Sequence, residues 1–195
     1  TVHRTAYTYA GDERGLGDLE AELAAALSAG LPVKAVADPG LPFPVAGALK
    51  LEEQAELHPL VVLAELASEL RERGGVLVEG CRVRGVEADG TGVRLETGLG
   101  EVSADVCVLA TGTPVLDRGL FFARLEPLRS FVCAYPVPAG RLPDGMHVSV
   151  DAPHRSLRTA RDEAGRDVLV IGGGGHVTGR GGDTQAALHE MDAWA

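Results

Sequence analysis

The sequence has few cysteines, no long apolar run and no excess of positive charge, and each absence excludes a class of protein. Its three cysteines, Cys81, Cys107 and Cys133, form no CxxC pair, so we expect neither a disulfide framework nor a cysteine zinc site. No stretch is long enough to span a bilayer, and the first residues lack the layout of a signal peptide. The formal net charge of -10 argues against binding to nucleic acid or to an anionic membrane. We therefore expect a cytoplasmic protein.

The usual catalytic signatures are absent too. The glycines at 172–175 follow an apolar run, but Val177 and Thr178 stand where Gly-x-Gly-x-x-Gly requires its last glycine. There is no Walker sequence and no Gly-x-Ser-x-Gly nucleophile elbow. The six histidines lack the short paired spacing of metal ligands, so no metal site is predicted. The glycine run keeps two interpretations: a tight strand end, or bare backbone that a flat ring can approach closely.

What the sequence does contain is typical of a globular α+β protein. It has 195 residues, of which 45% are hydrophobic and 24% charged. Strand formers occupy 1–9, and Asp18 can cap a helix that runs to about residue 29. A weak strand follows at 33–37. A second helix begins at Pro59 and ends before the glycines at 74–75.

The remaining pattern predicts short strands. In the middle of the chain we expect a strand at 76–78, a meander from 82–87, 92–97 and 101–103, and a strand at 106–110 that is apolar on both faces. Later strands are expected at 131–137, 146–150, 156–160 and 168–172, followed by a helix capped by Asp183. The second half is therefore predicted to form a mostly antiparallel sheet with helices.

Two arginines lie in apolar strand contexts. Arg129 stands in Leu-Arg-Ser-Phe and Arg158 in Ser-Leu-Arg-Thr. A buried guanidinium needs a partner, because an unpaired charge is costly to remove from water. One interpretation is a structural ion pair, or a place at a sheet edge with the head in water. The other is a bidentate clamp for the carboxylate of a ligand.

The order of these segments resembles the D-amino-acid oxidase-like superfamily of FAD-dependent oxidoreductases, which includes glycine and sarcosine oxidases. It is most similar to the bacterial branch whose members often carry a Rieske domain. The segments that carry the resemblance are His58-Pro59, Gly74-Gly75, Cys81-Arg82-Val83, Ala-Asp-Val-Cys-Val-Leu-Ala-Thr-Gly at 104–112, Leu128-Arg129-Ser130-Phe131, Ser156-Leu157-Arg158, and Gly-Gly-Gly-Gly-His-Val-Thr-Gly at 172–179.

The resemblance implies roles for several residues. Arg158 would hold the carboxylate of an amino acid or secondary amine, with Arg129 as the second candidate, while flavin accepts a hydride. The residues implied to contact FAD are Val83, Ala110, Thr111, Gly112, Gly173, Gly174 and His176. Relatives usually have glutamate where Gly174 or Gly175 stands, so the sequence departs from the pattern there.

We interpret the chain as the central part of such an enzyme. The substrate-binding domain is expected at 1–57 and 117–182, and a partial FAD-binding α/β domain with the meander at 58–116 and 183–195. The glycine-rich turn that holds the FAD pyrophosphate is not in the sequence, so we expect this chain alone to bind FAD weakly and to be inactive. We expect it to form a homodimer or to pair with the FAD segment. The alternative is a non-catalytic domain that binds an acidic metabolite or a partner chain.

Overall fold

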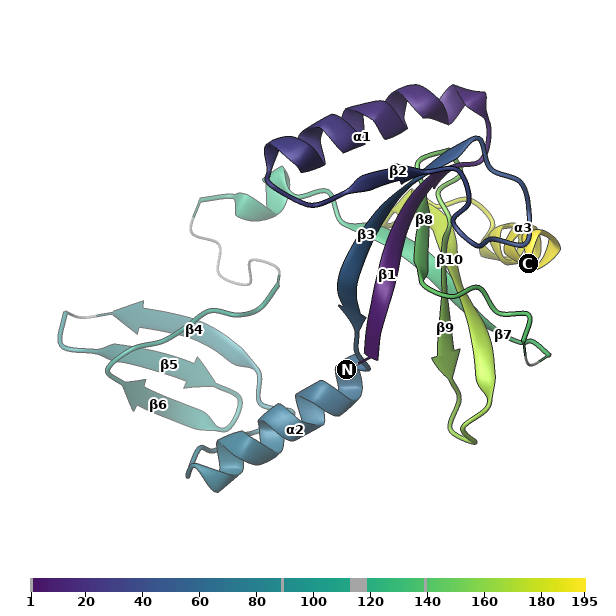
Figure 1. Ribbon diagram of the computed structural model, residues 1–195. Helices are drawn as coiled ribbons and strands as arrows, with labels where there is room; N and C mark the ends of the chain where they lie inside the picture. The colour runs from purple at the N-terminus through teal and green to yellow at the C-terminus, as the bar shows by residue number, and fades with distance from the viewer. Residues whose placement is uncertain (1, 89, 113–118, 139) are drawn as a thin grey trace. The chain divides into compact units, whose positions relative to one another are not determined.

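The computed structural model describes the chain except residues 1, 89, 113–118 and 139. It divides into two compact units (Figure 1). The first unit comprises Thr1–Leu57 and Pro127–Ala195, and the second is the intervening His58–Glu126. None of the described helices is long and apolar enough to cross a membrane.

The first unit is built on a seven-stranded sheet with the order β2-β3-β1-β8-β9-β10-β7. Every neighbouring pair is antiparallel except β1 and β8, which run parallel, so the predicted mostly antiparallel sheet is confirmed. The strands are β1 (Val2–Ala10), β2 (Lys34–Val36), β3 (Gly47–Glu56), β7 (Leu128–Pro136), β8 (Met146–Ser149), β9 (Ser156–Arg161) and β10 (Asp167–Val177).

Two helices pack on this sheet. The helix α1 (Leu16–Ser28) follows a short 3-10 turn, η1 (Glu13–Gly15), whose cap is the Asp12 carboxylate. The helix therefore begins two residues before the predicted cap at Asp18. The last helix, α3 (Thr184–Trp194), begins as predicted, with the Asp183 carboxylate accepting from the Gln185 amide at 2.9 Å. We expected α3 to join the second part of the chain, but it packs against β10 and belongs to the first unit.

The two faces of the sheet are covered differently, because alternate residues of a strand point to opposite sides. One face, the covered face, buries Tyr9, Leu157 and Ile171 beneath the loop that carries Phe43. On the other face, α1 places Leu19 against β1 and β3. On the part of that second face formed by β8, β9, β10 and β7, which we call the open face, Arg158, Val132 and Val148 are exposed, while Val170 between them is buried.

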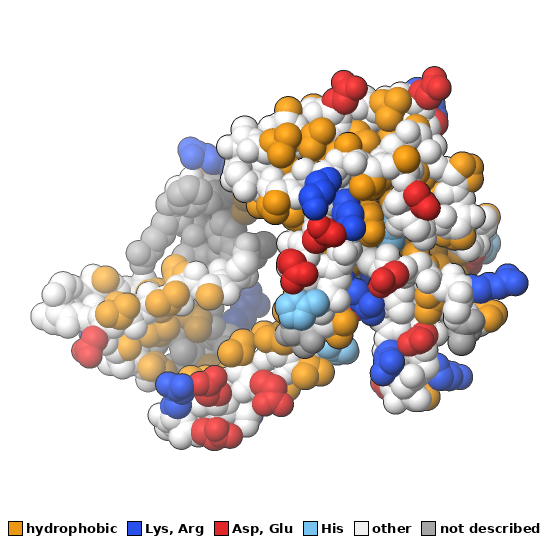
Figure 2. Space-filling model, viewed as in Figure 1, with side chains coloured by type: hydrophobic (Ala, Val, Ile, Leu, Met, Phe, Trp, Pro, Cys, Tyr) orange, Lys and Arg blue, Asp and Glu red, His pale blue; other side chains and the backbone are white. Residues whose placement is uncertain are grey.

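The second unit contains one helix and a three-stranded antiparallel meander. Its elements are α2 (Pro59–Glu72), β4 (Val83–Ala88), β5 (Val93–Thr97), β6 (Gly100–Ala104) and the 3-10 turn η2 (Phe121–Arg124). Pro59 occupies the first turn of α2, and the His58 ring accepts from the Val61 amide at 3.4 Å. None of its residues whose burial is described is buried. Figure 2 shows apolar side chains along α2 and over the meander.

Two predicted strands do not form. Residues 76–78 and 106–110 have no strand structure, and Val76 and Val108 are 84% and 82% exposed. A strand needs a hydrogen-bonded neighbour, and the described part of the second unit pairs only β4, β5 and β6. Conversely, β3 was not predicted. Its alternation is broken at Glu53, where φ is 55°, close to a register shift in the pairing with β1.

Candidate functional site

Arg158 lies on the open face in the middle of the sheet. It stands opposite Val170 of β10 on one side and Met146 of β8 on the other. The side chain is exposed, and it makes no hydrogen bond or ion pair with any described residue. The structural ion pair considered above is therefore absent from the described chain, and the guanidinium is free to bind an anion.

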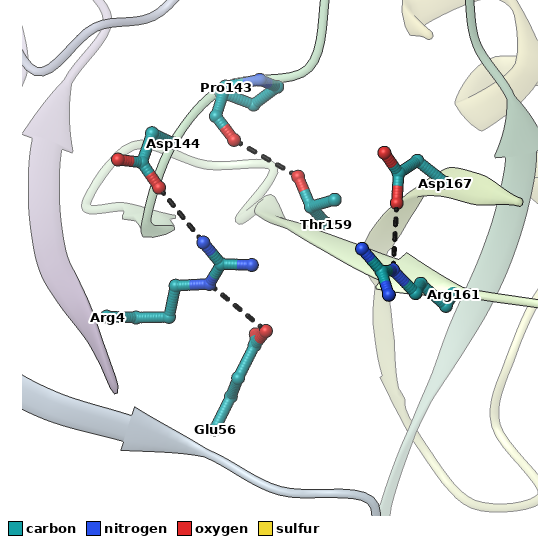
Figure 3. A network of polar contacts seen from close by, with 7 residues as sticks. All are labelled: Arg4, Glu56, Pro143, Asp144, Thr159, Arg161 and Asp167. Carbon is teal, nitrogen blue, oxygen red and sulfur yellow. Dashed lines mark hydrogen bonds and ion pairs between the residues drawn. The ribbon is translucent and has the colours of Figure 1, made fainter. Parts of the chain in front are cut away.

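Two other arginines of the same sheet, Arg4 and Arg161, differ from Arg158 because each has a carboxylate partner. Arg4 donates to Glu56 at 3.2 Å and to Asp144 at 3.1 Å, and Arg161 donates to Asp167 at 3.3 Å (Figure 3). These guanidinium groups are already occupied by carboxylates. Arg158, which lies on the same strand as Arg161, is not.

The residues that stand side by side with Ser156 across the open face form the next row, and their side chains are small and mostly apolar. Ser156 stands opposite Val148 of β8 and Gly172 of β10, and Gly172 in turn stands opposite Val132 of β7. Val132 and Val148 are 69% and 50% exposed. Arg158 thus projects beside a flat apolar surface on which Ser156 is the polar side chain nearest to it along β9.

Close packing explains why most positions of the run 172–175 are glycine. An added Cβ would lie 2.4 Å from the Ser156 hydroxyl at Gly172, 2.8 Å from the Arg155 guanidinium at Gly173, and 2.9 Å from the Phe131 ring at Gly174. Gly174 also has a φ of 63°, and the pairing of β10 with β7 shifts register here. At Gly175 a Cβ would meet nothing within 4 Å. A tight strand end therefore accounts for most of the run, and the approach of a flat ring to the backbone at Gly175 stays a prediction.

His176 is held beside this bulge. Its Nδ1 lies 2.9 Å from the Gly174 carbonyl, and its ring stacks on Phe131 with centroids 5.4 Å apart. Arg129 stands opposite His176 in the pairing of β7 with β10. Because Arg129 alternates with Phe131 along β7, it belongs to the covered-face side and not to the side of Arg158. The structure does not bring the two predicted arginines together.

A third arginine, Arg155, was missed by the sequence analysis. It is 3% exposed and lies on the covered-face side, because it alternates with Leu157. Its guanidinium pairs with Glu190 of α3, donates to the His154 carbonyl at 3.1 Å, and lies 5.9 Å from the Trp194 ring. The buried Nε has no hydrogen-bond partner. The sequence marks Arg155 only by its position three residues before Arg158, which places the two on opposite faces.

Two further contacts fix α3 on the covered face. The Tyr135 hydroxyl donates to Asp192 at 2.6 Å, and this hydrogen bond holds the pKa of Tyr135 above its usual value. Trp194 meets Phe43 edge to face at 5.8 Å, and Met191 is fully buried. The covered face is therefore a closed core, and the open face is where the described part of this unit can accept a ligand.

The residues implied to contact FAD fall in both units. Gly173, Gly174 and His176 form the bulge in the first unit. Val83 lies on β4 opposite Thr97, and residues 110–112 form an exposed segment without regular structure, both in the second unit. In the described chain, no three His, Cys, Asp or Glu side chains converge as a metal site would require.

The chemistry of the open face fits a flat ring system and an anion. The short apolar side chains of Val132 and Val148 and the bare backbone of Gly172 allow close approach of a planar ring. The free Arg158 fork matches the geometry of a carboxylate.

The chain belongs to the FAD dependent oxidoreductase family called DAO, whose family model matches residues 2–195. Among known proteins it is 25% identical over 181 residues to YhfW of Bacillus subtilis (strain 168), whose name describes a Rieske 2Fe-2S iron-sulfur protein. The match covers 92% of this chain and 35% of YhfW, so the chain spans about a third of that relative.

Solved structures show the same fold. L-proline dehydrogenase from P. horikoshii matches with a TM-score of 0.69 at 17% identity, over 99% of this chain and 55% of that one. Glycine oxidase from Geobacillus kaustophilus matches with a TM-score of 0.68 at 20% identity, over 97% and 54%. The resemblance to D-amino-acid oxidase-like flavoproteins is thereby confirmed at the level of family and fold.

Proposed function

We propose that this chain is the substrate-binding part of a flavoenzyme that oxidises an amino acid or a secondary amine. The observation that carries the proposal is the free guanidinium of Arg158 on an exposed apolar sheet face. An anion is attracted to that charge, and the apolar side chains around it offer no competing carboxylate. Small zwitterions that carry a carboxylate are ligands of this kind.

The residues of this chain would act by positioning. Arg158 would hold the carboxylate by two parallel hydrogen bonds, and this fixes the direction of the neighbouring α-carbon. FAD, when bound, supplies the acceptor for the hydride that leaves this carbon. Gly173, Gly174 and His176 are the proposed cofactor contacts of the first unit, and Val83 and residues 110–112 remain candidates in the second. No acid from the protein is strictly required for the transfer.

The relatives suggest that more of the enzyme is needed for activity. This chain covers 54–56% of the length of three similar solved structures, which are L-proline dehydrogenase, glycine oxidase and NikD, an unusual amino acid oxidase. A dinucleotide fingerprint is not in its sequence. We therefore propose that FAD binds tightly only to the longer enzyme and weakly to this chain.

Replacement of Arg158 by lysine tests the anchor. Arg158→Lys keeps the charge but loses the fork, so the apparent affinity for an amino acid should fall on the order of ten- to a hundredfold, which corresponds to about 1.5–3 kcal/mol. Arg161→Lys, on the same strand but already paired with Asp167, is the matched control and should leave affinity unchanged. A lowered melting temperature with unchanged affinity in Arg158→Lys would contradict the anchor role.

One observation favours a second function, that of a non-catalytic domain that binds a partner chain. The second unit exposes large apolar side chains, including Val76, Val108 and Leu109. NMR titration of the purified chain with a small carboxylate such as propionate separates the two functions. Saturable binding that Arg158→Lys weakens supports the substrate-binding part of an enzyme, and a chain that binds no small carboxylate supports the partner-binding domain.

A further inference from the structure

Ser156 lies between Arg158 and the glycine bulge on the open face. It precedes Arg158 by two residues, so the two side chains share a face and their Cα atoms are about 6.6 Å apart in an extended strand. Because β9 and β10 are antiparallel, moving from Arg158 to Ser156 also moves from Val170 to Gly172 and so towards the bulge. A ligand that extends from Arg158 towards the bulge must pass over Ser156.

The hydroxyl of Ser156 is free and is held close to the sheet. It makes no hydrogen bond with any residue in the described part of the chain, and the side chain is exposed. An added Cβ on Gly172 would lie only 2.4 Å from this oxygen, so the hydroxyl leans over the bare backbone of Gly172. The oxygen therefore lies low on the sheet surface, where a ligand resting on that surface would meet it.

Few other side chains near Arg158 on the open face could form a hydrogen bond with a ligand. In the row of Ser156 and Gly172, the adjacent Val148 and Val132 cannot form a hydrogen bond, and the next polar side chain, Thr8, lies on β1 beyond Val148. In the row of Arg158, the neighbours Met146 and Val170 are apolar as well. A small zwitterion on this surface would find one cation and, next to it along the same strand, one hydroxyl.

We propose that Ser156 is a specificity-determining residue that accepts a hydrogen bond from the amine of the ligand while Arg158 holds its carboxylate. This inference rests on the function proposed above. A serine oxygen accepts through its lone pairs, whereas the guanidinium can only donate, so the two side chains recognise different ends of the ligand. Two fixed points orient the α-carbon between them, and a carboxylic acid without an amine gains only one of the two contacts.

The test compares alanine with propionate, which share a carboxylate and a three-carbon skeleton but differ in the amine. Binding of each to the chain is followed by NMR titration for the natural protein, Ser156→Ala and Ser156→Thr. Ser156→Ala should weaken alanine binding roughly five- to tenfold and propionate binding less than about twofold, as expected for one hydrogen bond. Ser156→Thr keeps the hydroxyl and should restore the preference. Ser103→Ala, an exposed serine on β6, is the control and should change neither affinity.

A second variant removes the contact without removing the serine. Gly172→Ala places a Cβ against the Ser156 oxygen and must displace it, so it should weaken alanine binding in the natural background and have no further effect beside Ser156→Ala. If propionate binds and Ser156→Ala leaves the preference for alanine unchanged, the role of Ser156 is overturned and the Arg158 anchor stands. If propionate binding is absent or insensitive to Arg158→Lys, the anchor fails and this proposal fails with it.

Discussion

The two units of this chain have similar kinds of secondary structure but differ in burial. The first unit contains every buried residue that the structure describes, and these include the clusters around Tyr9 and Leu49. The second has a well-capped helix and a regular meander, yet none of its residues with a described burial is buried. Local signals are thus sufficient to define helices and hairpins, while a core requires strands that are distant in sequence.

The largest difference between the units should appear on truncation of a core side chain. Ile171 is fully buried, so Ile171→Ala should lower the free energy of unfolding of the first unit by about 4 kcal/mol, because it removes apolar contacts and leaves a cavity. The single tryptophan, Trp194, reports on this unit in a denaturant titration. Val148→Ala, at a half-exposed position of the same sheet, is the control and should cost far less.

A smaller loss of stability is expected when the ion pair that attaches α3 to the sheet is broken. Glu190→Gln leaves the buried Arg155 charge without its carboxylate and should cost about 2 kcal/mol, less than a fully buried pair because Glu190 is 52% exposed. Glu163→Gln, at an exposed site of the hairpin between β9 and β10, is the matched control. Hydrogen exchange of the α3 amides should increase in Glu190→Gln, and unchanged protection there would show that the helix is held without this pair.

The first unit should also lose stability in acid through His147. This histidine is fully buried and stacked on Tyr7, and burial lowers its pKa below the ordinary value of 6.5. The unfolded chain therefore binds a proton at a higher pH than the folded chain, so this contribution is fully present above pH 6.5 and declines as the pH falls towards the folded pKa. His147→Gln should remove that part of the pH dependence measured by urea unfolding, and an unaltered slope between about pH 5 and 6.5 would contradict it.

The smallest effect is expected in the second unit. Leu66 lies on α2 and is 55% exposed, so Leu66→Ala should change the stability of the chain by less than about 0.5 kcal/mol. Circular dichroism during thermal unfolding would detect a larger change. A loss above about 2 kcal/mol would mean that Leu66 is buried in solution, and a loss that depends on protein concentration would assign that burial to a second copy of the chain.

What could be predicted from the sequence follows the same division. The helix that begins at Pro59, the meander and the cap at Asp183 depend on neighbours within a few residues, and each was recognised. The strand β3 was missed, because a bulge at Glu53 breaks its alternation. The strands expected at 76–78 and 106–110 were wrong, because apolar composition alone does not supply a pairing partner.

At the candidate site, the sequence identified Arg158 as a candidate but did not predict which residues surround it. Arg158 was selected from its apolar context, and its place on an uncovered face depends on the order of the strands around β9. Arg155 was overlooked, because its burial is created by Glu190 and Trp194, which lie more than thirty residues further along the chain. The role of Gly172 likewise became visible only through the Ser156 oxygen on the adjacent strand.

The parallel pairing of β1 with β8 has a consequence for how the protein is made. β1 obtains its first neighbour from β3, but its second comes from β8, and Met146 is about 136 residues beyond Ala10. At about 5–20 residues per second of synthesis, β8 is translated roughly 7–27 seconds after β1. From the time β3 has been made until β8 emerges, the antiparallel β1–β3 pair has an unsatisfied edge on the ribosome, available to chaperones and to neighbouring nascent chains. Slowing translation between β3 and β8 should therefore lengthen the time for which this edge is exposed.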